Sequence, residues 1–342
     1  MKILMIEDSP DSIQGIIDFC KDENYDCLVN DFEAGLSIME QFDPDIVILD
    51  LKNNVGEGFD GLEILDRIWE KNFRPVCVFS AQINESTIET NNYNSLLVKF
   101  VNKGDETPVI DYLKRIAPYG SSISTVRKRT NEAMRHAFDF IDLAIADNIT
   151  DAGIISKMCN NRIKAYFDKE NEGQDMPAWS QYIYPVLDNN FLTGDIIRLK
   201  NRTGEPNSED DYFIILSQSC DISHGNIDFI LVAQGDKISN IGTFKKPDRY
   251  VTILNTGFER HFVPMPEIKN VMPDLAFNLK KLSLIPLIEI GGLYEKIASL
   301  ASPYKERLIW AYMSNACRPG VPDLAVEEWA QKFSQNVVED KK

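Results

Sequence analysis

Short apolar runs alternate with amphipathic stretches along residues 1–118. Five runs have the composition of buried strands, and they cover 2–6, 25–29, 45–49, 75–79 and 96–101. Apolar residues recur at helical spacing between and after these runs, over 10–22, 33–41, 60–71, 84–92 and 106–117. Strands that alternate with helices form a parallel sheet that is covered by helices on both faces. The pattern therefore predicts a five-stranded, doubly wound (βα)5 α/β domain over residues 1–118.

The pattern changes at "PYGSS" (118–122), where turn-forming residues interrupt the periodicity. Helical spacing returns over 123–147 and again over 151–169, so we expect residues 119–175 to form a helical linker or dimerisation region. The first of these helices combines a basic cluster at 126–129 with an apolar stripe. Such a stripe either pairs two copies of the chain in a homodimer or packs the helix against its own domain.

Residues 176–342 have a third pattern, in which strand-like runs are separated by turn residues. These runs are "GDIIRL", "DYFIILSQ", "DFILVAQ", "RYVTIL", "HFVPM" and "LSLIPLIEI". Helical spacing follows in "YEKIASLA", "YKERLIWAYMSNA" and "LAVEEWAQKFS". We therefore expect an α+β domain over 176–342, with a mostly antiparallel sheet or a small barrel.

Composition narrows the class of protein. The chain has 342 residues and a formal net charge of −17, and most of the acidic excess falls in residues 1–118. Nonspecific binding to nucleic acid rests on Lys and Arg, so this charge disfavours a nucleic-acid partner. Six cysteines are scattered without a CxxC pair, no long apolar segment is present, and no signal-peptide pattern opens the chain. We therefore expect a cytoplasmic protein with reduced thiols and no membrane span.

Polar side chains follow the predicted strands of the first domain at the points where those strands end. Glu7 and Asp8 follow the first strand, Asp50 the third, Ser80 the fourth and Lys103 the fifth. Ligands of doubly wound sheets bind at the carboxyl ends of the strands, so we expect these side chains to lie together. Three carboxylates in one place favour a hard cation such as Mg²⁺. A nearby hydroxyl and lysine suit phosphoryl oxygens, so the set predicts phosphoryl transfer to a carboxylate.

The segments that carry these residues resemble a known family. "ILMIEDS", "DIVILDLKN", "VFSA" and "FVNKG" are similar to the acidic-pair, phosphoacceptor, hydroxyl and lysine motifs of response-regulator receiver domains, in the same order. The resemblance implies a bacterial two-component response regulator that is phosphorylated on Asp50 by a sensor histidine kinase or a phosphotransfer protein. It also implies that Mg²⁺ is held by Glu7, Asp8, Asp50 and the backbone carbonyl of Lys52.

The same resemblance assigns the phosphoryl oxygens to Ser80 and Lys103. Phe100 matches the aromatic switch residue, whose rotamer follows the hydroxyl residue. Two positions depart from the family pattern: Asn54 replaces the usual proline after the phosphoacceptor, and Gly104 stands where a proline usually follows the lysine. We expect these departures to change the lifetime of the phosphoryl group rather than its attachment.

A structural alternative exists for the residues at the strand ends. Asp8 would cap a helix that has Pro10 in its first turn, and Ser80 would cap another helix. Lys103 would then be an ordinary surface charge. The five residues together favour the phosphoryl site over this alternative.

The run "YFIILSQSCDI" leads to Cys220 and Asp221, with His224 close behind. A cysteine beside a base is the arrangement of a nucleophilic hydrolase. Cys220 and His224 would alternatively join His261 and Cys317 in a tetrahedral zinc site. Because lone cysteines are more often small buried hydrophobes, a structural role stays the default expectation.

Residues 176–342 leave three hypotheses open for the output of the regulator. We favour a protein-interaction module, because no recognisable enzyme signature is present. The second hypothesis is an enzyme, either a Cys220-based hydrolase or a ribonuclease, since "GDIIRL" and "FIILSQSCDI" are weakly similar to strands of PemK-type toxin barrels. The third is a nucleic-acid-binding regulator that uses "VRKR". The segments "SQSCDI" and "ACRPGVPDL" also resemble the carboxy-terminal half of receiver-containing proteins linked to phage defence.

Overall fold

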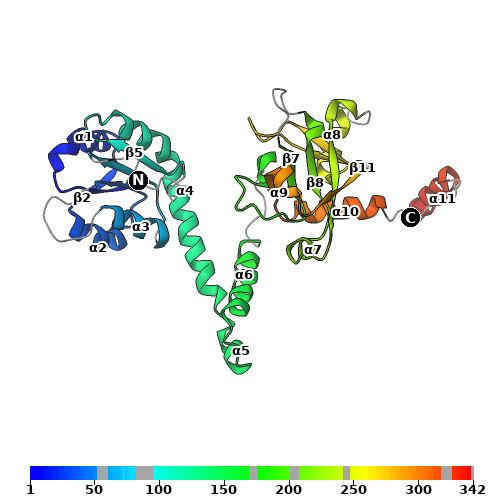
Figure 1. Ribbon diagram of the computed structural model, residues 1–342, viewed down its shortest axis with the longest axis horizontal. Coiled ribbons are helices and arrows are strands. Elements are labelled where there is room, and N and C mark those ends of the chain that lie inside the picture. Colours follow the sequence, from blue (N-terminus) through cyan, green and yellow to red (C-terminus); the bar gives the residue numbers. More distant parts are fainter. Residues whose placement is uncertain are drawn as a thin grey trace. The chain divides into compact units, whose positions relative to one another are not determined.

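The computed structural model describes residues 1–51, 61–71, 73–81, 83, 95–168, 176–200, 208–241, 247–316 and 326–339. The chain divides into two compact units, an amino-terminal unit of residues 1–173 and a carboxy-terminal unit of residues 174–342 (Figure 1). Within the described ranges, no helix has both the length and the hydropathy needed to cross a membrane.

Five parallel strands form the sheet of the amino-terminal unit, in the order β2-β1-β3-β4-β5. Their bounds are β1 Lys2–Ile6, β2 Asp26–Asn30, β3 Ile46–Leu49, β4 Val76–Ser80 and β5 Val98–Asn102. The three central strands are buried over almost their whole length, which is why their sequences are near-continuous apolar runs. The strand order reverses between β1 and β3, and ligands bind at such a switch point. The predicted doubly wound parallel sheet is confirmed.

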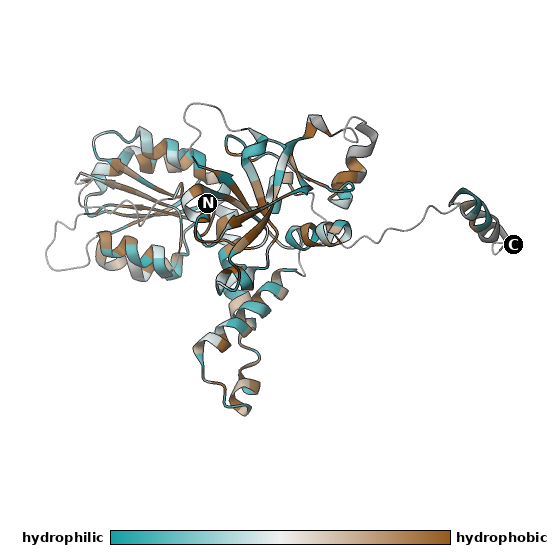
Figure 2. Ribbon diagram, turned by 45° about the vertical axis from the view of Figure 1, so that its right-hand side comes forward, coloured by the Kyte–Doolittle hydropathy of each residue, from teal (hydrophilic) through white to brown (hydrophobic). Residues whose placement is uncertain are grey.

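Helices cover both faces of this sheet. They are α1 Gln14–Asp22 and α4 Thr107–Ala137 on one face, and α2 Phe32–Phe42 and α3 Gly61–Lys71 on the other. Ile3 of β1 packs in a buried cluster with Ile16 of α1, whereas its neighbour Leu4 packs with Ile68 of α3. This alternation follows from the two-residue period of a strand, and Figure 2 shows the apolar strands between the helices. The helix that we predicted over 84–92 lies outside the described residues.

Helix α4 continues without a break to Ala137, so the expectation that a helix ends at 118–122 is wrong. Pro118 lies inside this helix, where a proline removes one backbone hydrogen bond and costs about 3 kcal/mol. Packing compensates at the same place. Gly120 is buried, and a Cβ built on it would lie 3.4 Å from the Cβ of Asp45. Close contact with the sheet therefore outweighs the helix-breaking tendency of the local sequence.

A single carboxylate ties α4 to the segment that precedes β3. Asp43 pairs with Arg127 and Lys128 of α4, and the distance from Lys128 Nζ to Asp43 Oδ2 is 3.3 Å. Asp43 also accepts a hydrogen bond of 3.0 Å from Arg74, whose Nε donates to the carbonyl oxygen of Pro44. Burial on its own would raise the pKa of Asp43, but the hydrogen bond from Arg74 and the two cations of α4 outweigh burial and lower this pKa.

Replacing Asp43 with asparagine is expected to lower the free energy of unfolding of the amino-terminal unit by about 2 kcal/mol at neutral pH, because the buried Arg74 loses its carboxylate partner. The folded pKa of Asp43 lies below its ordinary value of 3.8, so its stabilisation is complete above that pH and disappears as the pH falls through the folded pKa. Urea unfolding of both proteins should therefore give curves that converge as the pH falls through the folded pKa of Asp43, below 3.8.

The exposed pair of Asp18 and Lys21 supplies the control. Asp18→Asn should change stability by less than about 0.5 kcal/mol, as is usual for surface ion pairs. An Asp43→Asn variant as stable as the wild type at neutral pH would contradict the assignment.

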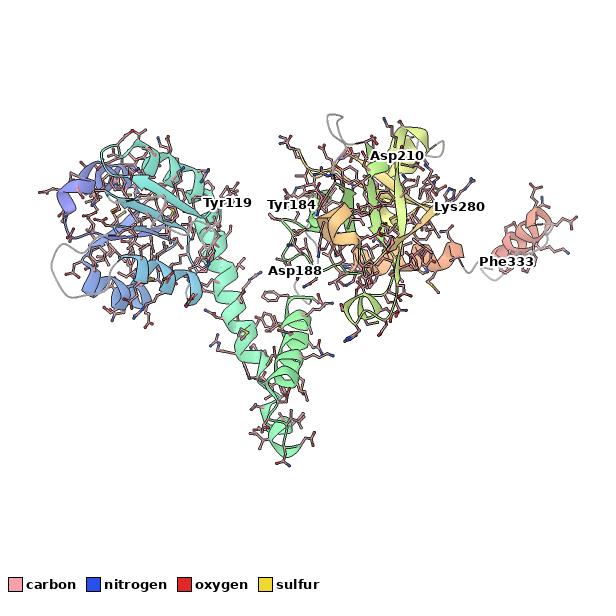
Figure 3. All side chains as sticks on the ribbon, in the orientation of Figure 1. Tyr119, Tyr184, Asp188, Asp210, Lys280 and Phe333 are labelled. Atoms are coloured by element: carbon pink, nitrogen blue, oxygen red, sulfur yellow. The ribbon has the colours of Figure 1, made fainter. Side chains whose placement is uncertain are left out.

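The distal part of α4 is covered by a helix that returns alongside it. After α4 come α5 Ile141–Ala146 and α6 Ala152–Asp168, and α6 packs against α4. Ala137 of α4 and Cys159 of α6 share a buried cluster. Part of the predicted apolar stripe is therefore used within its own unit. Tyr119, which is labelled in Figure 3, and Val126 are exposed on α4, and the pairing of two copies remains a prediction.

Seven strands form the sheet of the carboxy-terminal unit, in the order β10-β11-β9-β8-β7-β12-β6, with antiparallel pairing throughout. Their bounds are β6 Tyr182–Ile183, β7 Asp195–Leu199, β8 Tyr212–Ile215, β9 Phe229–Lys237, β10 Phe262–Met265, β11 Leu275–Pro286 and β12 Tyr294–Leu300. The predicted antiparallel sheet is confirmed. The described strands do not close into the small barrel that was the other alternative, because β10 and β6 are separate edges.

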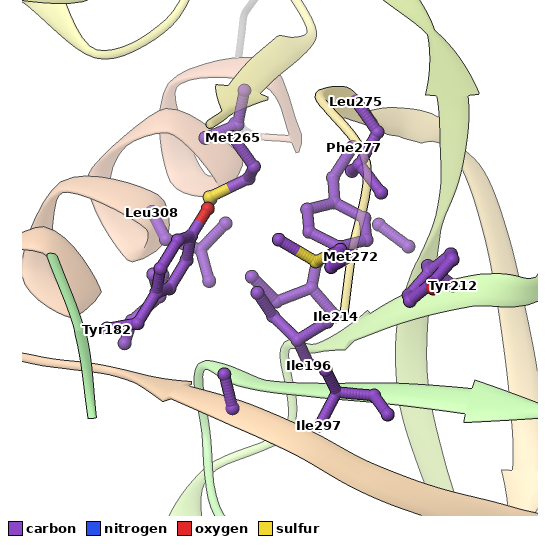
Figure 4. Close-up of a cluster of buried hydrophobic side chains, with 14 of the residues drawn as sticks. Tyr182, Ile196, Tyr212, Ile214, Met265, Met272, Leu275, Phe277, Ile297 and Leu308 are labelled. Carbon is purple, nitrogen blue, oxygen red and sulfur yellow. The ribbon is translucent and has the colours of Figure 1, made fainter. Parts of the chain in front are cut away.

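Successive residues of the central strands enter two different cores. Ile196 and Ile214 belong to a large buried cluster with Phe277 (Figure 4), whereas Ile197 and Ile215 belong to a second cluster. The sheet is therefore covered on both faces, as successive side chains of a strand point to opposite sides. The helices of this unit are α7 Ser219–Ser223, α8 Pro247–Thr256, α9 Ile290–Leu293, α10 Tyr304–Ala316 and α11 Val326–Glu339.

Two segments of the carboxy-terminal unit differ from their predicted type. "RYVTIL", predicted as a strand, lies in α8, a helix that begins at Pro247, and proline is favoured in the first turn of a helix. "YEKIASLA", predicted as a helix, forms β12 instead. A register shift between Lys296 and Ala298 puts two successive buried residues, Ile297 and Ala298, on this strand. The extra residue breaks the period of two and imitates helical spacing.

Candidate functional site

Three carboxylates meet at the carboxyl ends of β1 and β3. The backbone N–H of Asp50 donates to the carbonyl oxygen of Ile6 at 3.0 Å, which holds the end of β3 beside the end of β1. Glu7, Asp8 and Asp50 each offer a carboxylate oxygen, and these oxygens lie within 4.8 Å of one another. Glu7 and Asp50 are 4% exposed, so their charges are shielded from water. The structure therefore brings together the three carboxylates that the sequence places at these strand ends.

Lys103 lies directly against two of these carboxylates. Its Nζ is 2.7 Å from Asp50 Oδ2 and 2.7 Å from Glu7 Oε2. The backbone of β4 fixes the position of the lysine, because its N–H donates to the carbonyl oxygen of Ser80 at 3.0 Å. Gly104 follows with a φ of +128°, which the proline usual at this position in the family cannot adopt.

The charges of the cluster shift the pKa values of its members. Burial raises the pKa of Glu7, the charge of Asp50 adds to this rise, and hydrogen bonding to Lys103 offsets only part of it. Burial on its own would lower the pKa of Lys103, but its hydrogen bonds to Asp50 and Glu7 prevail and raise this pKa. The lysine is therefore held in its charged form.

Two backbone features around Asp50 have no signature in the side-chain pattern. The N–H of Leu51 donates to Asp50 Oδ1 at 2.7 Å and so orients the carboxylate. Gly61, at the start of α3, donates its N–H to the carbonyl oxygen of Leu51 at 3.1 Å. A Cβ on Gly61 would lie 2.1 Å from the backbone oxygen of Asp50. The sequence shows Gly61 at the end of "FDG", but its contact with the backbone of Asp50 and Leu51 arises only in the fold.

The other two residues that the sequence singled out lie on β4 and β5. Ser80 is fully buried at the end of β4. Phe100 is half-buried and packs against the cluster that contains Val78 and Leu49. Lys52 and Asn54 lie outside the described residues.

Comparison with solved structures finds receiver domains over about a third of the chain. The N-terminal domain of a response regulator/sensory box/GGDEF three-domain protein from Carboxydothermus hydrogenoformans is 22% identical, with a TM-score of 0.30, over 36% of this chain and 99% of its own. The BeF3-activated N-terminal receiver domain of RstA from Klebsiella pneumoniae is 17% identical, with a TM-score of 0.30, over 35% of this chain and 98% of its own. The N-terminal domain of a response regulator receiver protein from Methanoculleus marisnigri is 22% identical, with a TM-score of 0.26, over 34% of this chain and 94% of its own. No protein-family model and no curated protein matches the chain.

The all-parallel order β2-β1-β3-β4-β5 is the flavodoxin-like doubly wound order. The five-stranded sheet and the helices that cover it have the receiver fold. The names of the matched structures do not mention phage defence, so the resemblance of the other half to such proteins finds no support in them.

Outside the receiver, Cys220 is exposed on the short helix α7. Its Sγ lies 3.6 Å from Gln218 Oε1 and 3.9 Å from Asp221 Oδ1. His224 ends the same helix, and in the part of the chain that the structure describes no hydrogen bond joins its ring to the thiol. The proposed nucleophile and base are therefore neighbours along the chain without the contact that would activate the cysteine.

The serines beside Cys220 have structural partners. Ser217 Oγ accepts the N–H of Leu231 at 2.8 Å, and Ser219 Oγ accepts the N–H of Thr193 at 3.0 Å. The hydroxyl groups of Ser217 and Ser219 therefore have structural roles, because each one accepts a hydrogen bond from a backbone N–H of another strand or loop.

Among the described residues, no group of potential ligands outside the receiver supports the zinc hypothesis. Their one group of three or more potential ligands is that of the receiver, and Cys317 lies outside them. The ring of His261 packs against Phe262, with 4.1 Å between ring centroids. Burial, with the charges of Lys280 and Arg260, lowers the pKa of His261.

Proposed function

We propose that the receiver accepts a phosphoryl group on Asp50 and that the chain acts as a two-component response regulator. The observation that carries this proposal is the position of Lys103, whose charged Nζ lies 2.7 Å from Asp50 Oδ2 within a buried acidic cluster. Helix capping, the structural alternative for these residues, does not require a lysine at this place. The spacing instead suits a carboxylate that gains negative charge when it is phosphorylated.

The cluster fits a magnesium ion. Glu7, Asp8 and Asp50 supply hard oxygen ligands within 4.8 Å of one another, which is the donor type that Mg²⁺ prefers. In the proposal these three residues hold the ion together with the backbone carbonyl of Lys52. When bound, Mg²⁺ would neutralise charge on the phosphoryl oxygens.

The proposed reaction transfers the phosphoryl group from a phosphohistidine on a sensor kinase or phosphotransfer protein. A carboxylate oxygen of Asp50 attacks phosphorus, a P–O bond forms, and the P–N bond breaks. The imidazole leaves with the electron pair and takes up a proton from solvent. Lys103 remains charged and binds one phosphoryl oxygen, while the hydroxyl of Ser80 donates to another.

The signal would leave the receiver through β5 and α4. Phe100 lies on β5, and its rotamer would follow Ser80 once that hydroxyl binds the phosphoryl group. A protein that responds in this way needs two states with different affinity for the modification. We infer that the carboxy-terminal unit converts the change into contact with a partner protein.

Phosphorylation with a small donor tests the proposal. Incubation with acetyl phosphate and Mg²⁺ should add one phosphoryl group to the full chain by intact-mass measurement, and Asp50→Asn should add none. Asp45→Asn is the matched control, because Asp45 precedes the same strand that Asp50 follows. The proposal fails if the wild type gains no phosphoryl group, or if Asp50→Asn gains as much as the wild type.

A further inference from the structure

A pocket in the carboxy-terminal unit is separate from every residue considered so far for catalysis or metal binding. Its volume is about 370 Å³, and β10, α8, α10 and the segment before β6 supply its walls. Val263, Met265 and Leu308 line it and are buried in the main core of this unit. Figure 4 shows Met265 and Leu308 beside Tyr182 in this core. The walls of the pocket are therefore largely apolar.

Arg307 of α10 brings a positive charge to this apolar site. It is half-buried, lines the pocket, and lies over the ring of Tyr304, with 5.6 Å between the guanidinium carbon and the ring centroid. Among the residues that the structure describes, no carboxylate lies within ion-pair distance of this guanidinium. A partly desolvated cation gains strongly from an anionic partner.

Gly257 creates the space in which Arg307 lies. It adopts a φ of +82°, and a Cβ at this position would lie 1.9 Å from Cδ of Arg307 and 2.8 Å from its Nε. The N–H of Gly257 donates to the carbonyl oxygen of Ile253 at 2.7 Å and so terminates α8. An L-residue at this position would be strained and would push the arginine away from the pocket wall.

We propose that this pocket binds a small organic monocarboxylate. The apolar body of the ligand lies among Val263, Met265 and Leu308, and its carboxylate pairs with the guanidinium of Arg307. Asp274 is exposed and also lines the pocket, so its negative charge disfavours a second anionic group on the ligand. A volume of about 370 Å³ lies near the lower end of the range for small-molecule sites.

Titration of the full chain with octanoate, followed by calorimetry, tests the proposal. Octanoate should bind with a dissociation constant on the order of 0.1–1 mM, as expected for about ten non-hydrogen atoms. Octanol, which has the same apolar body without the charge, should bind at least about tenfold more weakly, as should the dicarboxylate suberate. Arg307→Gln should weaken octanoate binding by about tenfold and leave octanol binding unchanged.

Two further variants separate the charge from the fold. Lys269→Gln removes an exposed cation that does not line the pocket, and it should bind octanoate as the wild type does. Gly257→Ala should weaken octanoate binding by displacing Arg307. The comparison of octanoate with octanol on the wild type does not depend on the folding of any variant. The proposal is overturned if octanoate shows no saturable binding up to about 10 mM, if octanol binds equally well, or if a folded Arg307→Gln variant binds octanoate with wild-type affinity.

Discussion

Replacing Lys103 with methionine is expected to lower the free energy of unfolding of the amino-terminal unit by about 3 kcal/mol when divalent cations are absent. The lysine is the shared partner of Glu7 and Asp50, whose side chains are 3% and 4% exposed. Its removal leaves two buried carboxylates that repel each other, and the loss of one partner from a buried ion pair is strongly destabilising. Hydrogen exchange of β1 and β3 in the full chain would measure this loss.

Magnesium should recover much of the stability of the Lys103→Met variant, because a cation that binds only the folded state stabilises it. Lys99→Met is the matched control, since Lys99 is exposed on the same strand, and it should leave the exchange rates of β1 and β3 unchanged. If Lys103→Met were as stable as the wild type in the presence of a chelator, the contacts of Lys103 would contribute nothing to the fold. If added Mg²⁺ left the variant unchanged, the acidic cluster would not be a metal site.

Gly61→Ala is expected to destabilise the amino-terminal unit by about 3 kcal/mol and to reduce phosphoryl uptake. The new Cβ would lie 2.1 Å from the backbone oxygen of Asp50 and 2.4 Å from Cα of Leu51. Both neighbours are backbone atoms, so relief requires the backbone of Asp50 and Leu51 to move. Because Leu51 N–H orients the carboxylate of Asp50, this movement should disturb the position of the proposed phosphoacceptor.

Gly292→Ala provides the comparison for this substitution, because a Cβ at Gly292 meets no atom within 4 Å. Denaturant unfolding and phosphorylation by acetyl phosphate should both be near wild type for that control. Wild-type stability in Gly61→Ala would mean that the backbone of Asp50 and Leu51 adapts without cost, and the close approach of Gly61 would then not position Asp50.

The architecture of the receiver could be predicted from sequence because its strands are buried on both faces. Runs such as "DIVIL" have few alternatives, and parallel strands place their carboxyl ends together whatever the details of packing. This reasoning placed Glu7, Asp8, Asp50 and Lys103 at one site. It does not extend to contacts such as that between Asp43 and Arg74, which lie 31 residues apart and only meet in the fold.

The carboxy-terminal unit was harder to predict because its antiparallel strands are irregular. A bulge in β12 changes the period of its buried residues, and the apolar residues of "RYVTIL" favour a strand although Pro247 begins a helix there. No residue near Arg307 in the sequence indicates that this arginine lines a pocket. Its importance comes from Gly257, which is 50 positions earlier and leaves room for it.

Helix α4 is unbroken from the sheet of the receiver to its far end, so it moves as one rigid element. Its 31 residues extend for about 47 Å at 1.5 Å per residue. Beyond Arg127 the helix continues for ten residues, or about 15 Å, so a tilt of roughly 5° at Arg127 would move its far end by about 1 Å. Because Asp43 clamps the helix beside the sheet through Arg127 and Lys128, the pivot lies next to that clamp. Small rearrangements of the Asp43 clamp would thus change the direction of the last ten residues of α4.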